Sequence, residues 1–269
     1  MINTSVIAAF YNKLDYLKLV LAGFERQAEK NFELIIADDG SKEEVVAEIK
    51  KIQSNYSYPI KHIWQEDKGF RKNKILNKAV IESVSDYLIF IDADCIPHKA
   101  FIEGHLSFSD KNTSLTGRRV NLSYKITNRL SEDNVRNGFL ENNYLALIID
   151  GLFGESFYVE KGLYLKNKFL LNYFNKKSRG LLGCNFSLYK EDLLKINGFD
   201  ERYEAPSIGE DSDVQFRLEL LGVKIKSVNH AAVQYHLYHK LQERPFQNLQ
   251  LFEEVKKDQI SYTPFGLKK

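Results

Sequence analysis

Short apolar runs alternate with helical spacings through the first part of the chain, and this alternation limits the folds open to it. The apolar runs are of strand length, and between them apolar residues recur at steps of three and four, as in amphipathic helices. Strand and helix in this order predict a mostly parallel sheet with right-handed crossovers. The predicted strands cover residues 5–10, 32–37, 59–64 and 87–91, and the helices between them cover 14–28, 45–52 and 75–80.

The pattern loosens after about residue 115. Residues 121–180 are rich in Asn, Lys, Tyr and Phe and have no regular period. Because no repeat or low-complexity linker divides the chain, we expect one α/β domain over residues 1–269, a mixed, mainly parallel sheet flanked by helices. Its first half, residues 1–115, has the size of a nucleotide-binding unit, and residues 116–269 are more irregular. In that second half the spacing predicts helices at 193–196, 214–221 and 247–257 and a strand at 223–228.

Composition excludes several classes of protein. The chain has 38 basic and 36 acidic side chains, a net charge of +2, which gives no case for a nucleic-acid partner. Only 15 Gly and 5 Pro exclude a collagen-like chain. Two cysteines far apart, Cys95 and Cys184, make no disulfide framework and favour a reducing compartment. Without a signal-peptide pattern or an apolar run of about 20 residues, we expect a cytoplasmic protein that meets a membrane only from one side.

Two carboxylates directly follow the fourth predicted strand. Asp92 and Asp94 stand two residues apart after YLIFI, and open parallel sheets bind ligands beyond the carboxyl ends of their strands. Carboxylate oxygens can hold Mg²⁺ or Mn²⁺, and such a metal would neutralise phosphate charge. The alternative is a solvated turn. The buried strand that runs into the pair favours the metal site.

Two glycine turns bring polar residues to the same edge. Asp39 and Gly40 follow the second strand, where a carboxylate could accept hydrogen bonds from a base or ribose, or merely cap the next helix. Gly69 and Arg71 precede a later helix. A helix start and a guanidinium suit a diphosphate, and a solvated basic helix face is the alternative.

Three later clusters also carry candidate chemistry. Glu210 and Asp211 open a predicted helix, where a carboxylate could act as a general base or simply favour the helix dipole. His236 and His239 could supply nitrogen ligands to a metal, or be packed or surface histidines. Residues 183–185 (Gly-Cys-Asn) could let a ligand approach the backbone, or form an ordinary strand.

Taken in order, these segments resemble a known family. The opening VIAAFYNKLDYLKLVLAGFERQ, the turn IADDGS and the motif IDADCIP are similar to those of family-two glycosyltransferases with the GT-A fold. The stretch GCNFSLYKEDLLKINGFDERYEAPSIGEDSDVQFRLELLG resembles the galactosyltransferase and chondroitin-polymerase type. The resemblance runs from about residue 4 to about residue 240. It implies a Rossmann-like GT-A domain whose first half binds a nucleotide sugar and whose second half binds the acceptor and carries the catalytic base.

The resemblance also implies a role for each matched position. Asp211 would be the catalytic base, and Glu210 would hold the acceptor or the donor sugar. Asp94 would bind Mn²⁺ or Mg²⁺, His236 or His239 would complete the metal shell, and Asp92 would touch ribose or metal. The remaining nucleotide-sugar contacts would come from Ala8, Phe10, Asp39, Gly69, Arg71, Gly183, Cys184 and Asn185.

The implied activity is a metal-dependent, inverting transfer of Gal, GalNAc, Glc or GlcNAc from a UDP-sugar. The acceptor would be a glycan or a lipid-linked acceptor in bacterial polysaccharide or glycoconjugate synthesis. Two alternatives stay open, a catalytically inactive nucleotide-sugar-binding module and a sugar nucleotidyltransferase. The second would be expected to have a glycine-rich loop where this chain has Phe10-Tyr11-Asn12-Lys13.

Residues 139–176 mix many Phe, Tyr and Leu residues with Lys. Such a mixture could rest on an anionic membrane surface, which would make the protein peripheral at the inner face of a membrane. The alternative is an acceptor-side subdomain packed in the core.

Overall fold

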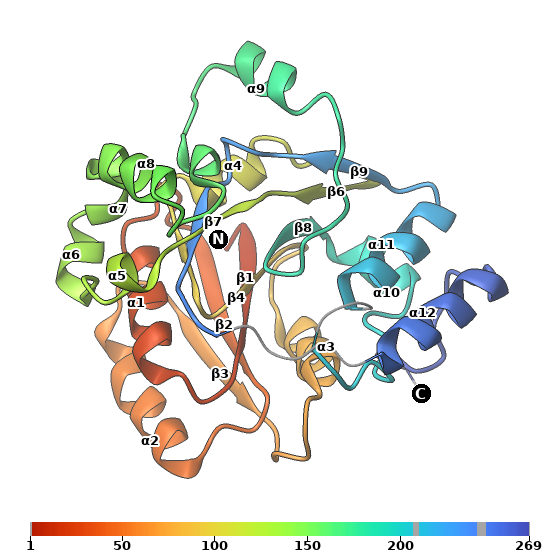
Figure 1. Ribbon diagram of the computed structural model, residues 1–269. Helices are drawn as coiled ribbons and strands as arrows, with labels where there is room; N and C mark the ends of the chain where they lie inside the picture. The colour runs from red at the N-terminus through yellow and green to blue at the C-terminus, as the bar shows by residue number, and fades with distance from the viewer. Residues whose placement is uncertain (1, 207–209, 241–245, 269) are drawn as a thin grey trace.

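The computed structural model describes residues 2–206, 210–240 and 246–268 (Figure 1). Within these residues the main sheet has seven strands in the order β3–β2–β1–β4–β8–β6–β9. Strands β3 to β4 run parallel, β8 is antiparallel to both neighbours, and β9 is parallel to β6. The predicted mixed, mainly parallel sheet is confirmed. Its strands are β1 (Thr4–Phe10), β2 (Phe32–Asp38), β3 (Ile60–Trp64), β4 (Tyr87–Asp92), β6 (Thr113–Thr116), β8 (Asn185–Tyr189) and β9 (Lys224–Ser227).

Helices cover both faces of this sheet (Figure 1). On one face, α1 (Leu14–Phe24) and α2 (Glu43–Ile52) contribute to one buried apolar cluster. On the other, α3 (Lys72–Glu82), α10 (Lys190–Lys195) and α11 (Glu210–Leu220) contribute to a second. Because both faces are covered, the central strands need apolar residues at every position rather than at alternate ones. This is why the first strands read as continuous apolar runs.

Successive residues of each central strand belong alternately to the two buried apolar clusters, one on each face of the sheet. Val6 and Leu34 belong to the cluster with α1 and α2, and Ile7 and Ile35 belong to the cluster with α3. All four side chains have no exposed surface. The strand period of two therefore fixes which side chains meet which helix, and it leaves the strand ends free to present polar groups.

The predicted elements differ from the observed ones mainly at their ends. The helix predicted over 14–28 ends at Phe24, because the chain then turns and the Ala28 N–H donates to the Lys99 carbonyl over 2.8 Å. In the second half the predicted pieces overlap α10, α11, β9 and α12 (Gln247–Asp258). The sequence pattern did not predict β6, nor the very short strands of a second sheet.

That second sheet brings distant segments to the end of β4. Its strands are β5 (Cys95–Pro97), β7 (Arg119–Asn121) and β10 (Gln234–His236). Strand β10 lies in the middle, antiparallel to β5 and parallel to β7. His236 pairs with Cys95, and the Leu237 N–H donates to the Asp94 carbonyl over 2.9 Å. Backbone pairing thus sets residues 94 and 236 side by side.

Short helices make up most of the irregular region from residue 124 to residue 174. Within residues 139–176 Leu147 and Leu171 are buried, but most large apolar side chains are exposed rather than packed in a core. In the described part of the chain, no helix has the length and apolar character needed to cross a bilayer. The remaining helices are η1 (Gln53–Asn55), α4 (Phe101–Leu106), α5 (Tyr124–Thr127), α6 (Glu132–Arg136), α7 (Phe139–Asn142), α8 (Tyr144–Leu152), η2 (Val159–Gly162) and α9 (Lys168–Phe174).

Candidate active site

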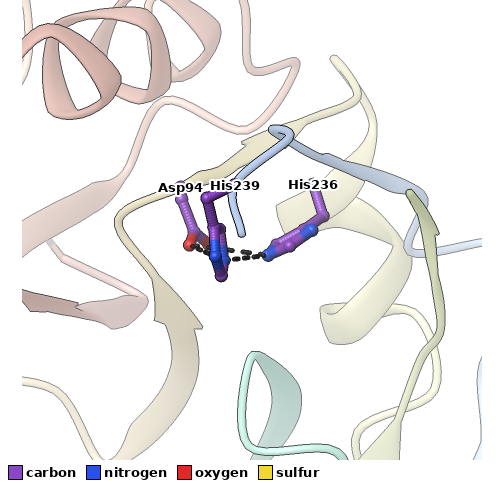
Figure 2. Close-up of side chains that lie close together, drawn as sticks. All are labelled: Asp94, His236 and His239. Atoms are coloured by element: carbon purple, nitrogen blue, oxygen red, sulfur yellow. Dashed lines mark hydrogen bonds and ion pairs between the residues drawn. The ribbon is translucent and has the colours of Figure 1, made fainter. Parts of the chain in front are cut away.

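Asp94, His236 and His239 form a compact group of potential metal ligands (Figure 2). The Asp94 Oδ2 atom lies 3.5 Å from His236 Nε2 and 3.3 Å from His239 Nε2. The two Nε2 atoms are 3.1 Å apart, and one ligand atom from each residue lies within 4.8 Å of the others. The three side chains point toward one another in Figure 2. The structure therefore brings together three of the four residues predicted to bind a metal.

The close contact of Asp94 with the two histidines favours the charged forms of Asp94 and His239. Burial would raise the pKa of Asp94, but hydrogen bonds from His236 and His239 and the charge of Arg119 hold it well below its usual range. The hydrogen bond to Asp94 in turn raises the pKa of His239 above its ordinary value. A carboxylate that stays ionised beside two imidazoles is a ready ligand set.

The donor set itself indicates which metal it suits. One carboxylate oxygen and two imidazole nitrogens fit a transition metal such as Mn²⁺, whereas Mg²⁺ prefers oxygen ligands alone. Two of the three ligands are only partly buried, with side-chain exposures of 21% for Asp94 and 23% for His239. The group is thus accessible from outside the protein.

Asp92, the fourth predicted ligand, is held differently. It ends β4, and its Oδ1 atom accepts a hydrogen bond from Lys72 Nζ over 2.8 Å. Within the described residues the ligand group consists of Asp94 and the two histidines. Asp92 as a metal or ribose contact stays a prediction, and Lys72 is a partner that the sequence reasoning missed.

Asp39 and Arg71 meet at the ends of β2 and α3. The Arg71 N–H donates to Asp39 Oδ2 over 2.7 Å, and Gln65 Nε2 donates to Oδ1 over 2.6 Å. Burial raises the pKa of Asp39 above its ordinary value, against the lowering effect of these hydrogen bonds. Two predicted nucleotide contacts are therefore parts of one hydrogen-bonded unit, and Gln65 joins them without having been predicted.

Both glycine turns have the backbone that the sequence suggested. Gly40 has φ +98°, and a Cβ there would lie 2.6 Å from the Asp67 Cα, so only glycine fits. Gly69 has φ +85° with open space around it. Asp67 also accepts a hydrogen bond from the Tyr11 hydroxyl over 2.9 Å. The turns that follow β2 and β3 are thus locked against each other beside Asp39.

Ala8 and Phe10 are less accessible than their predicted role requires. Ala8 has no exposed surface and Phe10 is 5% exposed, and both belong to the apolar cluster beneath the sheet. Their contact with a base stays a prediction. Tyr11 and Trp64, at the ends of β1 and β3, are 51% and 45% exposed. These rings are accessible at the same edge, and the sequence reasoning gave them no role.

Asp211 lies in the first turn of α11 and contacts the predicted donor segment. The Gly183 N–H donates to its Oδ2 atom over 3.0 Å, and the Ser212 N–H donates to Oδ1 over 2.8 Å. Asp211 is half-buried. The side chain of Glu210, also predicted to be catalytic, lies outside the described residues. Two of the predicted clusters, residues 183–185 and Asp211, are therefore in direct contact.

Cys184 continues this contact toward the metal group. Its thiol accepts hydrogen bonds from Arg119 Nη1 over 3.1 Å and Gln234 Nε2 over 3.3 Å. A hydrogen bond from Cys95 lowers the pKa of Cys184, and the charge of Arg119 acts in the same direction. The Cys95 sulfur also lies 3.3 Å from Asp94 Oδ1, so its single hydrogen can be donated either to Cys184 or to Asp94. Asp94 and Asp211 thus lie at the two ends of one short chain of contacts through the thiols.

Asn185 has its polar groups engaged within the protein. Its Nδ2 atom donates to the carbonyls of Arg118 and Ala232, each over 3.1 Å. Its Oδ1 atom lies 3.0 Å from His105 Nε2, and the side chain has no exposed surface. These bonds join β8 of the main sheet to the segments beside the second sheet. A direct contact of Asn185 with a donor sugar stays a prediction.

Two arginines complete the site and were missed by the sequence reasoning. Burial alone would lower the pKa of Arg119, but the thiols of Cys184 and Cys95 and the carboxylates of Asp92 and Asp94 outweigh it and raise the pKa. Arg118, its neighbour, has Cys184 and Asp211 among its charge partners. A permanent cation held between the two acidic groups suits an anionic ligand. The only sequence signal was the Gly-Arg-Arg run itself, in a stretch without periodicity.

The same regions match two family models. A model described as glycosyl transferase family 2 matches residues 5–178. A model described as the N-terminal domain of galactosyltransferase matches residues 166–240. Together these matches cover the span over which the sequence motifs showed a resemblance, and they include every residue of the candidate site described above.

Similar proteins agree with these matches. The chain is 26% identical to the chondroitin synthase of Escherichia coli over 241 residues, 86% of this chain but 34% of that protein. Among solved structures, S. aureus TarS 1–349 in complex with UDP-GlcNAc aligns with a TM-score of 0.64 at 15% identity, covering 96% of this chain and 66% of that one. The mannosyltransferase PcManGT from Pyrobaculum calidifontis, in complex with GDP-Man and Mn²⁺, aligns at 0.58 and 14%, covering 88% and 57%. These likenesses confirm the GT-A fold.

Proposed function

Since this chain belongs to glycosyl transferase family 2, we propose that it transfers a sugar from a UDP-sugar to a glycan or lipid-linked acceptor, with inversion and with help from Mn²⁺. The observation that carries the proposal is the contact path from Asp94, which has two histidines beside it, to Asp211. One end of that path offers metal ligands and the other offers a carboxylate. In transfer to a hydroxyl group, the metal would stabilise the leaving diphosphate and the carboxylate would take the hydroxyl proton.

The proposed chemistry is a single displacement. The acceptor hydroxyl gives its proton to the Asp211 carboxylate as its oxygen forms a bond to the anomeric carbon of the sugar. The bond from that carbon to the diphosphate breaks on the opposite face, and UDP leaves with the electron pair. Asp211 already accepts two backbone hydrogen bonds, which hold it in place and leave lone pairs free for the incoming proton.

The leaving diphosphate needs positive charge. Asp94, His236 and His239 would hold Mn²⁺, which when bound neutralises diphosphate charge. Arg119 has Asp94 among its charge partners and Arg118 has Asp211, and both would add fixed positive charge without reorganisation. Asp39, held by Gln65 and by the Arg71 N–H, would bind the nucleoside, and Arg71 with the Gly69 turn would lie near the diphosphate.

The choice of substrates rests on the similar proteins. TarS is solved with UDP-GlcNAc and with UDP, which supports a UDP-sugar as donor. This chain is also similar to the chondroitin synthase of Escherichia coli, which supports a growing glycan as acceptor. Because this chain spans about a third of that synthase, the acceptor is proposed only by class. We place the transfer in the cytoplasm, at the inner face of a membrane when the acceptor carries a lipid.

The proposal is tested by a donor screen. The purified chain is incubated with UDP-Gal, UDP-GalNAc, UDP-Glc and UDP-GlcNAc, with short glycans as acceptors and Mn²⁺ present, and released UDP is measured. We expect release with at least one donor, its loss on chelation by EDTA, and its recovery when Mn²⁺ is restored. UDP binding without release from any donor would contradict the proposal and favour an inactive nucleotide-sugar-binding module.

A further inference from the structure

Residues 161–179, here called the basic segment, differ in charge from the rest of the chain. They contain Lys161, Lys166, Lys168, Lys176, Lys177 and Arg179 and no acidic residue. Of the 38 basic side chains these are six, so the rest of the chain has 32 basic against 36 acidic. A chain that is nearly neutral overall therefore concentrates positive charge in one stretch, which includes α9.

The basic segment also exposes large apolar side chains. Phe169, Tyr173 and Phe174 are 78%, 59% and 51% exposed, and Leu170 is 41% exposed. Their spacing along α9 places them on one side of the helix, while Leu171 is buried beneath it. Exposed rings gathered on one helix face mark a surface that binds a partner. The lysines at positions 166, 168, 176 and 177 flank this face and are exposed.

The rest of the protein holds this face outward. The Leu165 N–H donates to the His230 carbonyl over 2.9 Å, and Asn175 exchanges hydrogen bonds with the Asn229 backbone at 2.8 and 3.0 Å. Figure 1 shows α9 at the top of the view, away from the main sheet. The loop that anchors it leads directly into β10, which carries His236. The basic segment is thus a fixed surface connected to the metal ligands.

The charge and the exposed rings of the basic segment indicate which partner it would bind. Among the described residues of the basic segment, Lys161 has an ion pair, with Glu160. Within the described chain the lysines at 166, 168, 176 and 177 have none, and Lys176 Nζ lies 5.0 Å from the centre of the Tyr173 ring. These four charges can therefore meet anions outside the protein. A second copy would set six like charges against six, which is unfavourable. A nucleic-acid duplex would meet the lysines with its phosphates but would not bury rings that are more than half exposed, because its bases are stacked inside the helix; a single strand, whose bases can stack on rings, is an outcome of the test below. Anionic phospholipids offer both phosphate and an apolar layer.

We propose that the basic segment docks the protein on an anionic bilayer, with Phe169, Tyr173 and Phe174 at the level of the headgroups and acyl chains and the lysines on lipid phosphates. This surface deepens the membrane location proposed above, and it does not require the chain to be an active transferase. It would hold the metal site at a fixed distance from the bilayer.

The test is vesicle flotation with the full chain and no substrate. Vesicles of phosphatidylcholine alone are compared with vesicles that also contain phosphatidylglycerol, at low and high salt. We expect binding to the anionic vesicles only, weakened by salt because exposed charges are screened. Equal binding to both vesicles, or binding to neither, would overturn the proposal. Loss of transfer activity would not affect this readout, so the two proposals fail separately.

Two variants and two matched controls sharpen the test. Changing the four lysines to Gln (K166Q, K168Q, K176Q and K177Q) should weaken binding by about fivefold per lysine, on the order of 100-fold or more together. The charge-matched control K42Q, K50Q, K111Q and K257Q changes four exposed lysines elsewhere and should keep most of the affinity. If both sets weaken binding equally, only net charge matters and the proposed surface is wrong.

The apolar part is tested in the same way. Phe169→Ser with Tyr173→Ser should lower vesicle affinity at least about tenfold, because each ring would bury apolar area. The control is Leu152→Ser with Phe153→Ser on α8, whose side chains are 80% and 82% exposed but stand near Asp150 and Glu155. We expect that control to bind like the parent. A mass in solution twice that of one chain, or RNA binding that excludes vesicles, would instead identify the other occupants and contradict the proposal.

Discussion

The two sheets present polar residues in different ways. In the main sheet, Asp39 directly follows β2 and Asp92 is the last residue of β4. Each acid can therefore be located in the sequence from the apolar run that precedes it. In the second sheet, three very short strands from distant positions meet, and their pairing sets His236 beside Asp94. The first arrangement is local and repeats. The second depends entirely on tertiary structure, and it brings together the candidate metal ligands.

The largest expected effect is at Asp211, which contacts the segment that leads into β8. Asp211→Asn should lower kcat for sugar transfer by about 10²–10⁴, since the amide cannot accept the proton. Affinity for UDP, measured by calorimetry, should stay near that of the parent. Asp110→Asn, an exposed loop substitution, is the control and should transfer at the parental rate. Parental turnover in the Asp211 variant, with an unchanged circular dichroism spectrum, would remove the base from the mechanism.

Next in size is the change at Asp94, the candidate metal ligand that directly precedes β5 of the second sheet. Asp94→Ala should weaken Mn²⁺ binding by at least about 100-fold, because even the loss of a partner outside the ligand shell typically costs 10–100-fold. The matched change in the main sheet, Asp92→Ala, should weaken Mn²⁺ binding less, since Asp92 is held by Lys72. Titration calorimetry with Mn²⁺ in the presence of UDP measures both. Equal losses would mean that the two acids share the metal.

A third change tests the link between the sheets. Asn185→Ala removes the amide that bonds Arg118, Ala232 and His105, and it leaves buried partners unsatisfied. We expect a loss of about 1–3 kcal/mol in the free energy of unfolding, measured by urea denaturation, with Asn55→Ala, exposed on the surface, as control. A stable Asn185 variant with a raised KM for the donor would show a direct donor contact instead.

The smallest expected effect is on proton binding. The hydrogen bond to Asp94 raises the pKa of His239, so protons compete with metal more strongly there than at a free imidazole. Affinity for Mn²⁺ should therefore fall as the pH drops through this raised pKa. In metal-free protein, Asp94→Asn removes the carboxylate charge, and NMR titration should then find a lower pKa for His239. An unchanged pKa would mean that the two side chains do not interact in solution.

Much of the fold could be predicted from sequence because β1, β2 and β4 are buried on both faces. Burial on both faces forces continuous apolar runs, and Asp39 and Asp92 could be located from where those runs end. Residues 121–180 gave no such signal, whereas the later spacings still predicted pieces that overlap α10, α11, β9 and α12. Strands of three residues such as β5, β7 and β10 are too short to show a period, and short helices with exposed apolar faces do not alternate.

The candidate site divides in the same way. Asp94, Asp211, His236 and His239 were found because acids and imidazoles stand out in motifs. Arg119, Lys72 and Gln65 were missed because their roles depend on which groups surround them after folding. Arg119 has its effect only through burial beside two thiols and two carboxylates. Phe10 and Ala8, chosen from motif position, proved to be largely core residues.

The sequence by itself determined the order of the first strands and helices, the family, and the residue types available for chemistry, because apolar periodicity and motif composition are local properties of the chain. Tertiary structure decided which of those residues meet. Hydrogen bonding between β10 and its neighbours sets His236 beside Asp94, and α11 packing sets Asp211 against Gly183. These contacts join residues far apart in sequence, and only backbone pairing and packing in the folded chain can hold them within a few ångströms.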